Sequence, residues 1–163
     1  MNTYFYSHCA GSVIAMKLLD RLNQSGSHFV QGYMAGASIP PRKALSGVNI
    51  WKHMSNKRIA KALNKAGLGL DTADIHLLDN RLDNFRSQTL LFTEYFHNKK
   101  EKTDICITPI VSRKDPLTPD YKNAQKRWLE VANDINEVFY LDTPSHYFQT
   151  TDAEFLLKIF SNI

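Results

Sequence analysis

Hydrophobic and polar positions alternate along the first part of the chain in a way that predicts a strand, a helix and a second strand. The segments are a strand at 3–7, a helix at 13–24 and a strand at 28–33. Within the helix Ile14, Leu18 and Leu22 recur every fourth position, so we expect them to form the buried face. Lys17 and Asp20 then point away from it. Two strands joined in this way form a βαβ unit, which predicts an α/β fold with a parallel sheet.

The rest of the chain is mostly helical, with two further short apolar runs. Helical patterns lie at 51–66, 72–97, 121–134 and 152–162, and the apolar runs lie at 104–112 and 137–141. We interpret both runs as further strands of the same sheet. Gly67 and Gly69 separate the first two helical patterns, and no internal repeat or low-complexity linker divides the chain.

Length and composition fit one packed domain over residues 1–163. The chain has 163 residues, of which 43% are hydrophobic and 22% charged, and these values are typical of a folded globular domain. No stretch approaches the ~20 apolar residues of a membrane helix. The N-terminus has neither the basic start nor the apolar core of a secretory signal. We therefore expect a cytoplasmic protein with no membrane partner.

The charge balance is mildly basic. There are 20 Lys and Arg against 16 Asp and Glu, a formal net charge of +4. The lysines are scattered and are not clustered with stacking aromatic residues, so we expect no nucleic-acid partner. A small basic excess suits an anionic protein or ligand instead.

The cysteines and histidines show no metal-binding pattern. Cys9 and Cys106 form no CxxC pair and are expected to be free thiols. The 6 histidines include no HExxH spacing. We therefore expect no metal site.

The first candidate site lies where the first strand turns into the first helix. Ser7-His8-Cys9-Ala10-Gly11 stands in the context of a nucleophile elbow of the form G-x-S-x-G, with small residues at Ser7 and Gly11. The helix N-terminus behind Cys9 favours a developing negative charge, and the backbone N–H of Ala10 is the expected oxyanion donor. Cys9 is therefore a candidate nucleophile. A small buried thiol is an equally good interpretation of this segment taken alone.

Two further residues follow predicted strands in the order that would complete a triad. Asp115 comes directly after the run at 104–112, and His146 follows the run at 137–141. Nucleophile, acid and histidine is the chain order of G-x-S-x-G enzymes. His146 would deprotonate Cys9, and Asp115 would orient the imidazole. Taken singly, Asp115 also fits ordinary turn chemistry, and His146 also fits a loop histidine with no role.

These residues and their surroundings resemble the type II thioesterases that accompany nonribosomal peptide and polyketide synthases, and the related thioesterase domains at synthase ends. The matching stretches run in order over nearly the whole chain: Ser7–Ser12 for Gly-His-Ser-Met-Gly-Ala, 29–42 for the strand and Pro-Arg turn after the elbow helix, Leu82–Arg86 for a Leu-Arg-Ala-Asp stretch of the lid, Lys114–Leu117 with Trp128 for the acid loop and the helix after it, and Ser145–Phe148 for Gly-His-Phe-Phe. Many chain-terminating domains carry the acid right after the strand that follows the elbow helix. Here that strand ends in Gln31-Gly32-Tyr33, so the resemblance is closer to the stand-alone editing type.

The resemblance implies a partial α/β-hydrolase fold, with a mostly parallel sheet flanked by helices and a helical lid insertion at 44–102. It implies hydrolysis or transfer of acyl groups from phosphopantetheine thioesters by a catalytic triad of Cys9, Asp115 and His146, with Ala10 in the oxyanion hole. An acyl or peptidyl carrier protein is the implied partner, and no cofactor is implied because the substrate is itself carried on phosphopantetheine. Apolar residues of the lid region are candidates for an acyl pocket or for plain core packing: Trp51, Leu63, Leu68, Leu77, Leu78, Leu90, Leu91 and Phe92.

The chain departs from the family's pattern in two respects. Cysteine stands in place of serine, and the resulting thioester intermediate suits transfer to an amine or slow hydrolysis. The strands that precede the elbow in this family, with the loop that supplies a second oxyanion donor, are missing, and losing one donor typically costs about 10²–10³ in rate. We therefore expect a domain that lacks its N-terminal strands, with an exposed strand edge that favours self-association or a partner supplying the upstream segment.

Two rival functions stay open. One is a truncated, non-catalytic hydrolase module that binds a carrier protein or a partner chain. The other is a hydrolase of the same fold that acts on an oxygen ester or an amide.

Overall fold

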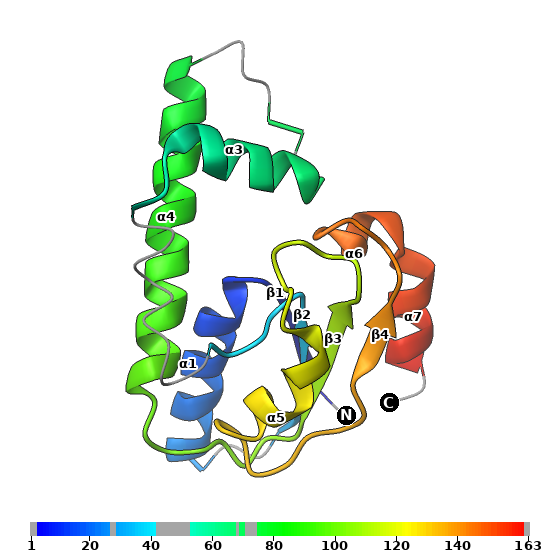
Figure 1. Ribbon diagram of the computed structural model, residues 1–163. Helices are drawn as coiled ribbons and strands as arrows, with labels where there is room; N and C mark the ends of the chain where they lie inside the picture. Colours follow the sequence, from blue (N-terminus) through cyan, green and yellow to red (C-terminus); the bar gives the residue numbers. More distant parts are fainter. Residues whose placement is uncertain (1–2, 27–28, 42–52, 68, 71–74, 162–163) are drawn as a thin grey trace.

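The structure is a computed structural model that describes residues 3–26, 29–41, 53–67, 69–70 and 75–161. Figure 1 shows a central sheet flanked by helices, with a pair of helices extending beyond the sheet as an arm. This arrangement has the layered α/β architecture that the sequence predicts.

The sheet has four strands in the order β1-β2-β3-β4, and each neighbouring pair is parallel. The strands are β1 Thr3–His8, β2 Val30–Gly36, β3 Ile107–Ser112 and β4 Phe139–Leu141. Every residue of β3 is buried, as expected for an inner strand covered on both faces. The residues of β1 are only half-buried, because β1 lies at the edge of the described sheet. The predicted parallel sheet is confirmed.

Helices cover both faces of the sheet. The helices α1 Gly11–Gln24 and α5 Ala124–Trp128 pack on one face, and α6 Phe148–Thr151 and α7 Ala153–Ser161 pack on the other. The alternation of strand side chains decides which core each residue joins: Tyr33 and Ala35 lie in the core under α1, and Met34 lies in the core under α7.

The helix after β1 is confirmed, but the prediction of its buried face is wrong. Val13, Met16 and Leu19 pack against the sheet, and each is at most 1% exposed. Ile14 is 71% exposed and Leu18 is 40% exposed. Both stripes have helical spacing, so periodicity alone does not distinguish them. The turn from β1 into α1 fixes the rotation of the helix and therefore decides which stripe is buried.

The helix predicted at 121–134 is much shorter in the structure. A 3-10 turn η1 at Tyr121–Asn123 leads into α5, which ends at Trp128. Beyond that point the backbone pairs with Thr103, whose N–H donates to Val131 O at 3.0 Å and whose carbonyl accepts from Asn133 N–H at 2.9 Å. Groups used in this long-range pairing cannot also continue a helix, so the helix ends.

Other boundaries moved by a few residues. The strand predicted at 28–33 runs on to Gly36, and the strand predicted at 104–112 begins at Ile107. The closing helix predicted at 152–162 is α7, and the short helix α6 before it was not predicted. None of the helices in the described ranges combines the length and apolar character that a bilayer crossing needs.

The arm consists of α3 Asn56–Lys65 and α4 Ile75–Asn98. It has a small core of its own, in which Ile59 and Leu63 of α3 meet Leu82 of α4. At its base the arm is tied to α1 by Asp20, which accepts from Lys99 Nζ at 2.8 Å and from Tyr95 Oη at 2.9 Å. Asp20 therefore contacts α4 and is only partly exposed, whereas the sequence predicted that it points away from the packed face. The arm falls within the predicted lid at 44–102, whose first residues up to 52 lie outside the described ranges.

Candidate active site

Cys9 occupies a sharp turn between β1 and α1. Its φ is 52°, in the left-handed region that residues other than glycine rarely adopt. The turn is held by Cys9 N–H, which donates to Gly36 O at 2.8 Å, and by Ser12, whose N–H and Oγ both donate to Cys9 O at 3.1 and 2.7 Å. A strained residue fixed in this way at a strand-to-helix turn has the backbone that a nucleophile elbow requires.

The small residues around the elbow have different local roles. Ser7, which stands where glycine is usual, shares a hydrogen bond of 2.6 Å with Tyr33 Oη. A Cβ added at Gly11 would lie 3.7 Å from Ser7 Cβ, an ordinary van der Waals contact. The elbow is therefore not tightly packed between these two positions.

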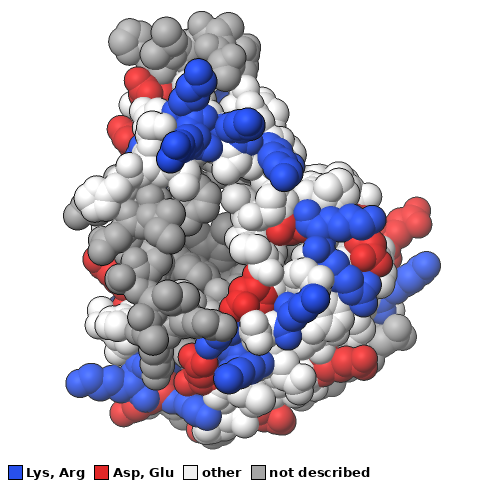
Figure 2. Space-filling view, in the orientation of Figure 1, with Lys and Arg blue, Asp and Glu red and all other residues white. Residues whose placement is uncertain are grey.

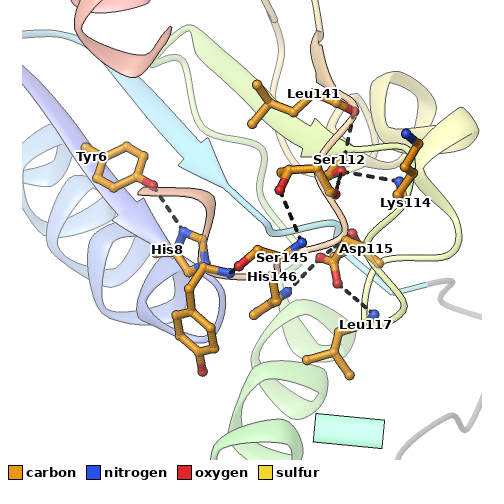
Figure 3. A network of polar contacts seen from close by, with 12 residues as sticks. Tyr6, His8, Ser112, Lys114, Asp115, Leu117, Leu141, Ser145 and His146 are labelled. Atoms are coloured by element: carbon orange, nitrogen blue, oxygen red, sulfur yellow. Dashed lines mark hydrogen bonds and ion pairs between the residues drawn. The ribbon is translucent and has the colours of Figure 1, made fainter. Parts of the chain in front are cut away.

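His146 lies in the loop between β4 and α6, directly beside Asp115 in the loop after β3 (Figure 3). His146 Nδ1 and Asp115 Oδ2 are 2.7 Å apart, and the two residues are 1% and 3% exposed. Asp115 also accepts from Leu117 N–H at 2.8 Å and from Thr118 Oγ1 at 2.7 Å. These two bonds prevent the Asp115 carboxylate from rotating, and the fixed carboxylate in turn holds the imidazole of His146 in one orientation.

The pKa values of this pair move in the directions that favour an ion pair. Burial alone would raise the pKa of Asp115, but the hydrogen bond and charge of His146 outweigh it, and the net effect is a lowered pKa. Burial alone would lower the pKa of His146, but the bond to Asp115 and the neighbouring Cys9 thiol raise it to about 9. The site thus stabilises a charged imidazolium beside an ionised carboxylate.

Cys9, Ala10 and His146 line one cavity of about 260 Å³. His146 Nε2 is buried and makes no well-aligned hydrogen bond with the described residues, although Cys9 is near enough to affect its pKa. Catalytic hydrogen bonds are often loose until a substrate binds. Cys9, His146 and Ala10, the predicted oxyanion donor, therefore face one cavity, and Asp115 lies beside His146 without lining that cavity. Their catalytic role stays a prediction.

The apolar wall of this cavity only partly matches the predicted one. Phe85 and Phe92 of α4 line it, together with Leu117 from the Asp115 loop. Of the predicted candidates, Leu63 and Leu78 pack in the core of the arm, and Leu90 and Leu91 do not line the cavity. Trp51, Leu68 and the side chain of Leu77 lie outside the described residues.

His8 is a neighbour of the site that the sequence reasoning missed. Its ring meets the His146 ring edge-on, with centroids 5.2 Å apart, and stacks on Tyr147 at 5.6 Å. Its Nδ1 is 3.1 Å from Tyr6 Oη (Figure 3). Burial, followed by the charge of His146, lowers the pKa of His8 to about 4. A neutral His8 adds no second positive charge beside His146. Its place in the motif next to Cys9 was the only sequence signal.

Ser112, at the end of β3, also escaped prediction. Its Oγ donates to the carbonyl of Thr143 and accepts from Lys114 N–H at 3.2 Å. The hydroxyl thus ties the loop that carries Asp115 to the loop that carries His146 (Figure 3). Among the described residues no group of His, Cys, Asp and Glu side chains is arranged to hold a metal ion.

Comparison with known proteins gives matches only at the level of structure. No family model matches the chain, and no curated protein sequence matches it. RedJ, the thioesterase from the prodiginine pathway of Streptomyces coelicolor, superposes with a TM-score of 0.68 at 17% identity, over 98% of this chain and 63% of RedJ. ClbQ from the colibactin NRPS/PKS pathway superposes with a TM-score of 0.71 at 16% identity, over 99% of this chain and 68% of ClbQ.

A protein with different chemistry also matches. A laboratory-evolved variant of the potato epoxide hydrolase StEH1 superposes with a TM-score of 0.53 at 12% identity, over 99% of this chain and 69% of that protein. The chain therefore has the α/β-hydrolase fold, and it spans less than two thirds of the length of RedJ. Since this fold carries several chemistries, the fold by itself does not select the reaction.

Proposed function

We propose that the protein is a thioesterase that moves the acyl group of a phosphopantetheine thioester onto Cys9 and then onto water or an amine. The Cys9 thiolate attacks the carbonyl carbon, and the new C–S bond forms as the C–S bond to pantetheine breaks. His146 accepts the Cys9 proton and passes it to the departing pantetheine sulfur, while Asp115 stabilises the imidazolium. The observation that carries this proposal is the 2.7 Å bond between His146 and Asp115 beside a cavity that Cys9 also lines.

The second half of the cycle uses the same groups in reverse. His146 removes a proton from water or from an amine, which attacks the acyl-Cys9 carbonyl. The C–S bond to Cys9 breaks, the sulfur regains its proton from His146, and a carboxylic acid or an amide leaves. The N–H of Ala10, at the N-terminus of α1, would stabilise the oxyanion in both halves, because the first N–H groups of a helix have no partner within the helix.

A thioester substrate fits the cysteine nucleophile better than an oxygen ester does. Attack by a thiolate on a thioester exchanges one sulfur leaving group for another of similar basicity, so the step is nearly balanced in energy. Attack on an oxygen ester would have to expel a much more basic alkoxide. The named thioesterase function of RedJ points in the same direction.

A carrier protein as partner is supported by the charge of α3. Lys57, Lys61 and Lys65 recur every fourth position, so they lie along one side of the helix, and Arg58 stands next to the first of them. All four are exposed, and none forms an ion pair with a described carboxylate. The segment α3 contains no acidic residue, and blue side chains gather over it in Figure 2. Such a stripe attracts an acidic protein surface.

The test of the reaction is acylation of Cys9. The protein and the variants Cys9→Ala and Cys106→Ser are each incubated with an acyl-pantetheine thioester. The reactions are quenched, and the mass of the intact protein is measured by mass spectrometry. We expect an acyl adduct on the parent and on Cys106→Ser, and none on Cys9→Ala. The lifetime of the adduct with and without an added amine separates hydrolysis from transfer.

Two outcomes would contradict the proposal. Folded protein that forms no adduct would favour the non-catalytic binding module. Faster acylation of Cys9 by the matching oxygen ester than by the thioester would favour the rival function, a hydrolase of the same fold that acts on oxygen esters or amides.

The test of the partner compares two substrates. In the variant Lys57→Glu/Lys61→Glu we expect KM for an acyl group on a carrier protein to rise about tenfold at low salt, with the reaction of free acyl-pantetheine unchanged. The control Lys126→Glu/Lys158→Glu makes the same charge change on exposed lysines of α5 and α7. Equal effects of the two double variants would argue against α3 as the docking surface.

A further inference from the structure

The arm makes a direct backbone contact with the loop of the candidate catalytic histidine. His146 N–H donates to Ala66 O, the carbonyl just past the end of α3, at 3.0 Å. Ala66 is 0% exposed and His146 is 1% exposed, so water cannot easily replace this bond. A residue on the sheet side of the site is therefore held by a residue of the arm.

The next residue, Gly67, lies directly against the same loop. Its φ is 89°, and a Cβ placed there would lie 3.3 Å from Ser145 Oγ, closer than most real Cβ contacts. Ser145 Oγ in turn accepts from Tyr147 N–H at 3.1 Å. The backbone on both sides of His146 is thus fixed by a local turn that the end of α3 covers.

This end of α3 is itself rigidly built. Ala66 N–H donates to Ala62 O and Leu63 O, each at 3.0 Å, and Gly67 N–H donates to Asn64 O at 3.0 Å. Asn64 Oδ1 accepts from Leu70 N–H at 2.6 Å and closes the turn. Since the core of the arm holds α3 against α4, a displacement of α3 would carry the Ala66 carbonyl away from His146.

The contact also has an electrostatic consequence. The last carbonyls of a helix carry the negative end of its dipole, roughly half an elementary charge, which favours a cation within about one turn. The end of α3 brings these carbonyls to the backbone of His146, whose imidazolium is the charged form that Asp115 also stabilises.

We infer that the C-terminal turn of α3, through the Ala66 carbonyl and Gly67, positions His146 for Cys9. Cys9 and His146 are then aligned only while the arm packs against the His146 loop. Gly67 is a positioning residue in this arrangement, and it is not among the residues that line the cavity. The consequence for turnover rests on the proposed function, but the alignment of His146 with Cys9 can be measured without a substrate.

The experiment compares two neighbouring glycines. Gly67 and Gly69 both have positive φ, 89° and 55°, but a Cβ at Gly69 would meet nothing within 4 Å. In a Cys106→Ser background, in which Cys9 is the remaining thiol, the rate of alkylation by iodoacetamide is measured against pH. For Gly67→Ala we expect alkylation at pH 7 to fall about tenfold and the pH profile to shift to higher pH. For Gly69→Ala we expect the parent profile within about twofold.

A second variant separates positioning from general damage. Ser145→Ala removes the oxygen that the new Cβ would meet at 3.3 Å. In Gly67→Ala/Ser145→Ala we therefore expect alkylation to recover to within about threefold of Ser145→Ala alone, as in a double-mutant cycle. Equal profiles for Gly67→Ala and Gly69→Ala, or no recovery in the double variant, would overturn the inference.

A measurement on the parent protein covers the case in which Gly67→Ala does not fold. Amide hydrogen exchange should show His146 N–H opening together with the amides of α3, and more readily than Arg113 N–H, which donates to Leu141 O within the sheet region. An unprotected His146 amide, or one that opens only with the sheet, would equally overturn the inference. The proposed function fails separately, through the absence of an acyl adduct on the parent.

Discussion

The carboxyl end of the sheet and the arm contribute to the same cavity in different ways. The sheet end supplies the reactive groups, each in the turn or loop that follows a strand: Cys9 after β1, Asp115 after β3 and His146 after β4. The arm supplies apolar wall from α4 and a backbone contact from α3. Parallel strands bring their carboxyl ends to one edge of the sheet, so residues that follow these strands lie close together because of the sheet topology alone. The arm reaches the site only by packing against it, and its contribution therefore depends on long-range contacts.

Removing the acid is the strongest test of the sheet end. We expect Asp115→Asn to slow acylation of Cys9 by about 10³–10⁴, because an amide favours the wrong tautomer of His146 and no longer stabilises the imidazolium. Asp142→Asn is the control: Asp142 also follows a strand but is exposed, and it pairs with Arg113 at 2.9 Å. The measurement is the rate of adduct formation by rapid-quench mass analysis. Similar losses in both variants would mean that Asp115 has no special role.

Core truncation compares the stability of the two regions. Ile110 and Leu82 are both 0% exposed, one in the sheet and the other in the arm. Replacing either by Ala should cost about 2–5 kcal/mol locally. We expect Ile110→Ala to lower the free energy of global unfolding, and Leu82→Ala to increase hydrogen exchange mainly in α3 and α4. Loss of sheet protection in Leu82→Ala would show that arm and sheet unfold as one unit.

The pH dependence of stability tests the two histidines that touch each other. The pKa of His146 is raised from 6.5 to about 9. The stabilisation of the folded state by protonated His146 is therefore complete below pH 6.5 and is lost as the pH rises towards 9. The pKa of His8 is lowered from 6.5 to about 4, so the folded state loses stability as the pH falls from 6.5 towards 4. The free energy of unfolding should therefore peak near pH 6.5.

A ring substitution isolates the acid side of this profile. In His8→Phe, which keeps an aromatic ring, we expect the loss on acidification, of the order of 2 kcal/mol, to shrink while the loss on the alkaline side remains. His97→Phe makes the same substitution at an exposed position of α4 and is the control. The measurement is urea unfolding between pH 4 and pH 9.5. An unchanged acid side in His8→Phe would assign that loss to another group.

The smallest effect is expected on the exposed stripe of α1. Ile14→Gln should change the free energy of unfolding by no more than about 0.5 kcal/mol, because Ile14 is 71% exposed. Met16→Ala, on the face that packs against the sheet, should cost about 2–5 kcal/mol. Both values come from denaturant titration. A large loss for Ile14→Gln would show that this stripe is covered in solution.

Sequence reasoning predicted the sheet end more successfully than the arm or the helix faces. The candidate triad was predicted from position, because each of its residues lies in the turn or loop after an apolar run, and the structure confirms that these runs form strands. The prediction of the buried face of α1 was wrong because the helix has two apolar stripes, and periodicity does not show which of them is buried. His8 and Ser112 were missed because their partners, His146 and Thr143, lie far away in the chain.

The sequence by itself determined the order of strands and helices, and the placing of Cys9, Asp115 and His146 at the ends of three parallel strands. These features follow from local apolar patterns and from chain order. Tertiary structure alone decided that α1 buries Met16 and exposes Ile14, that α5 stops at Trp128, and that the Ala66 carbonyl meets the backbone of His146. Each of these outcomes depends on a contact between residues that are distant in the chain, and no local pattern encodes such a contact.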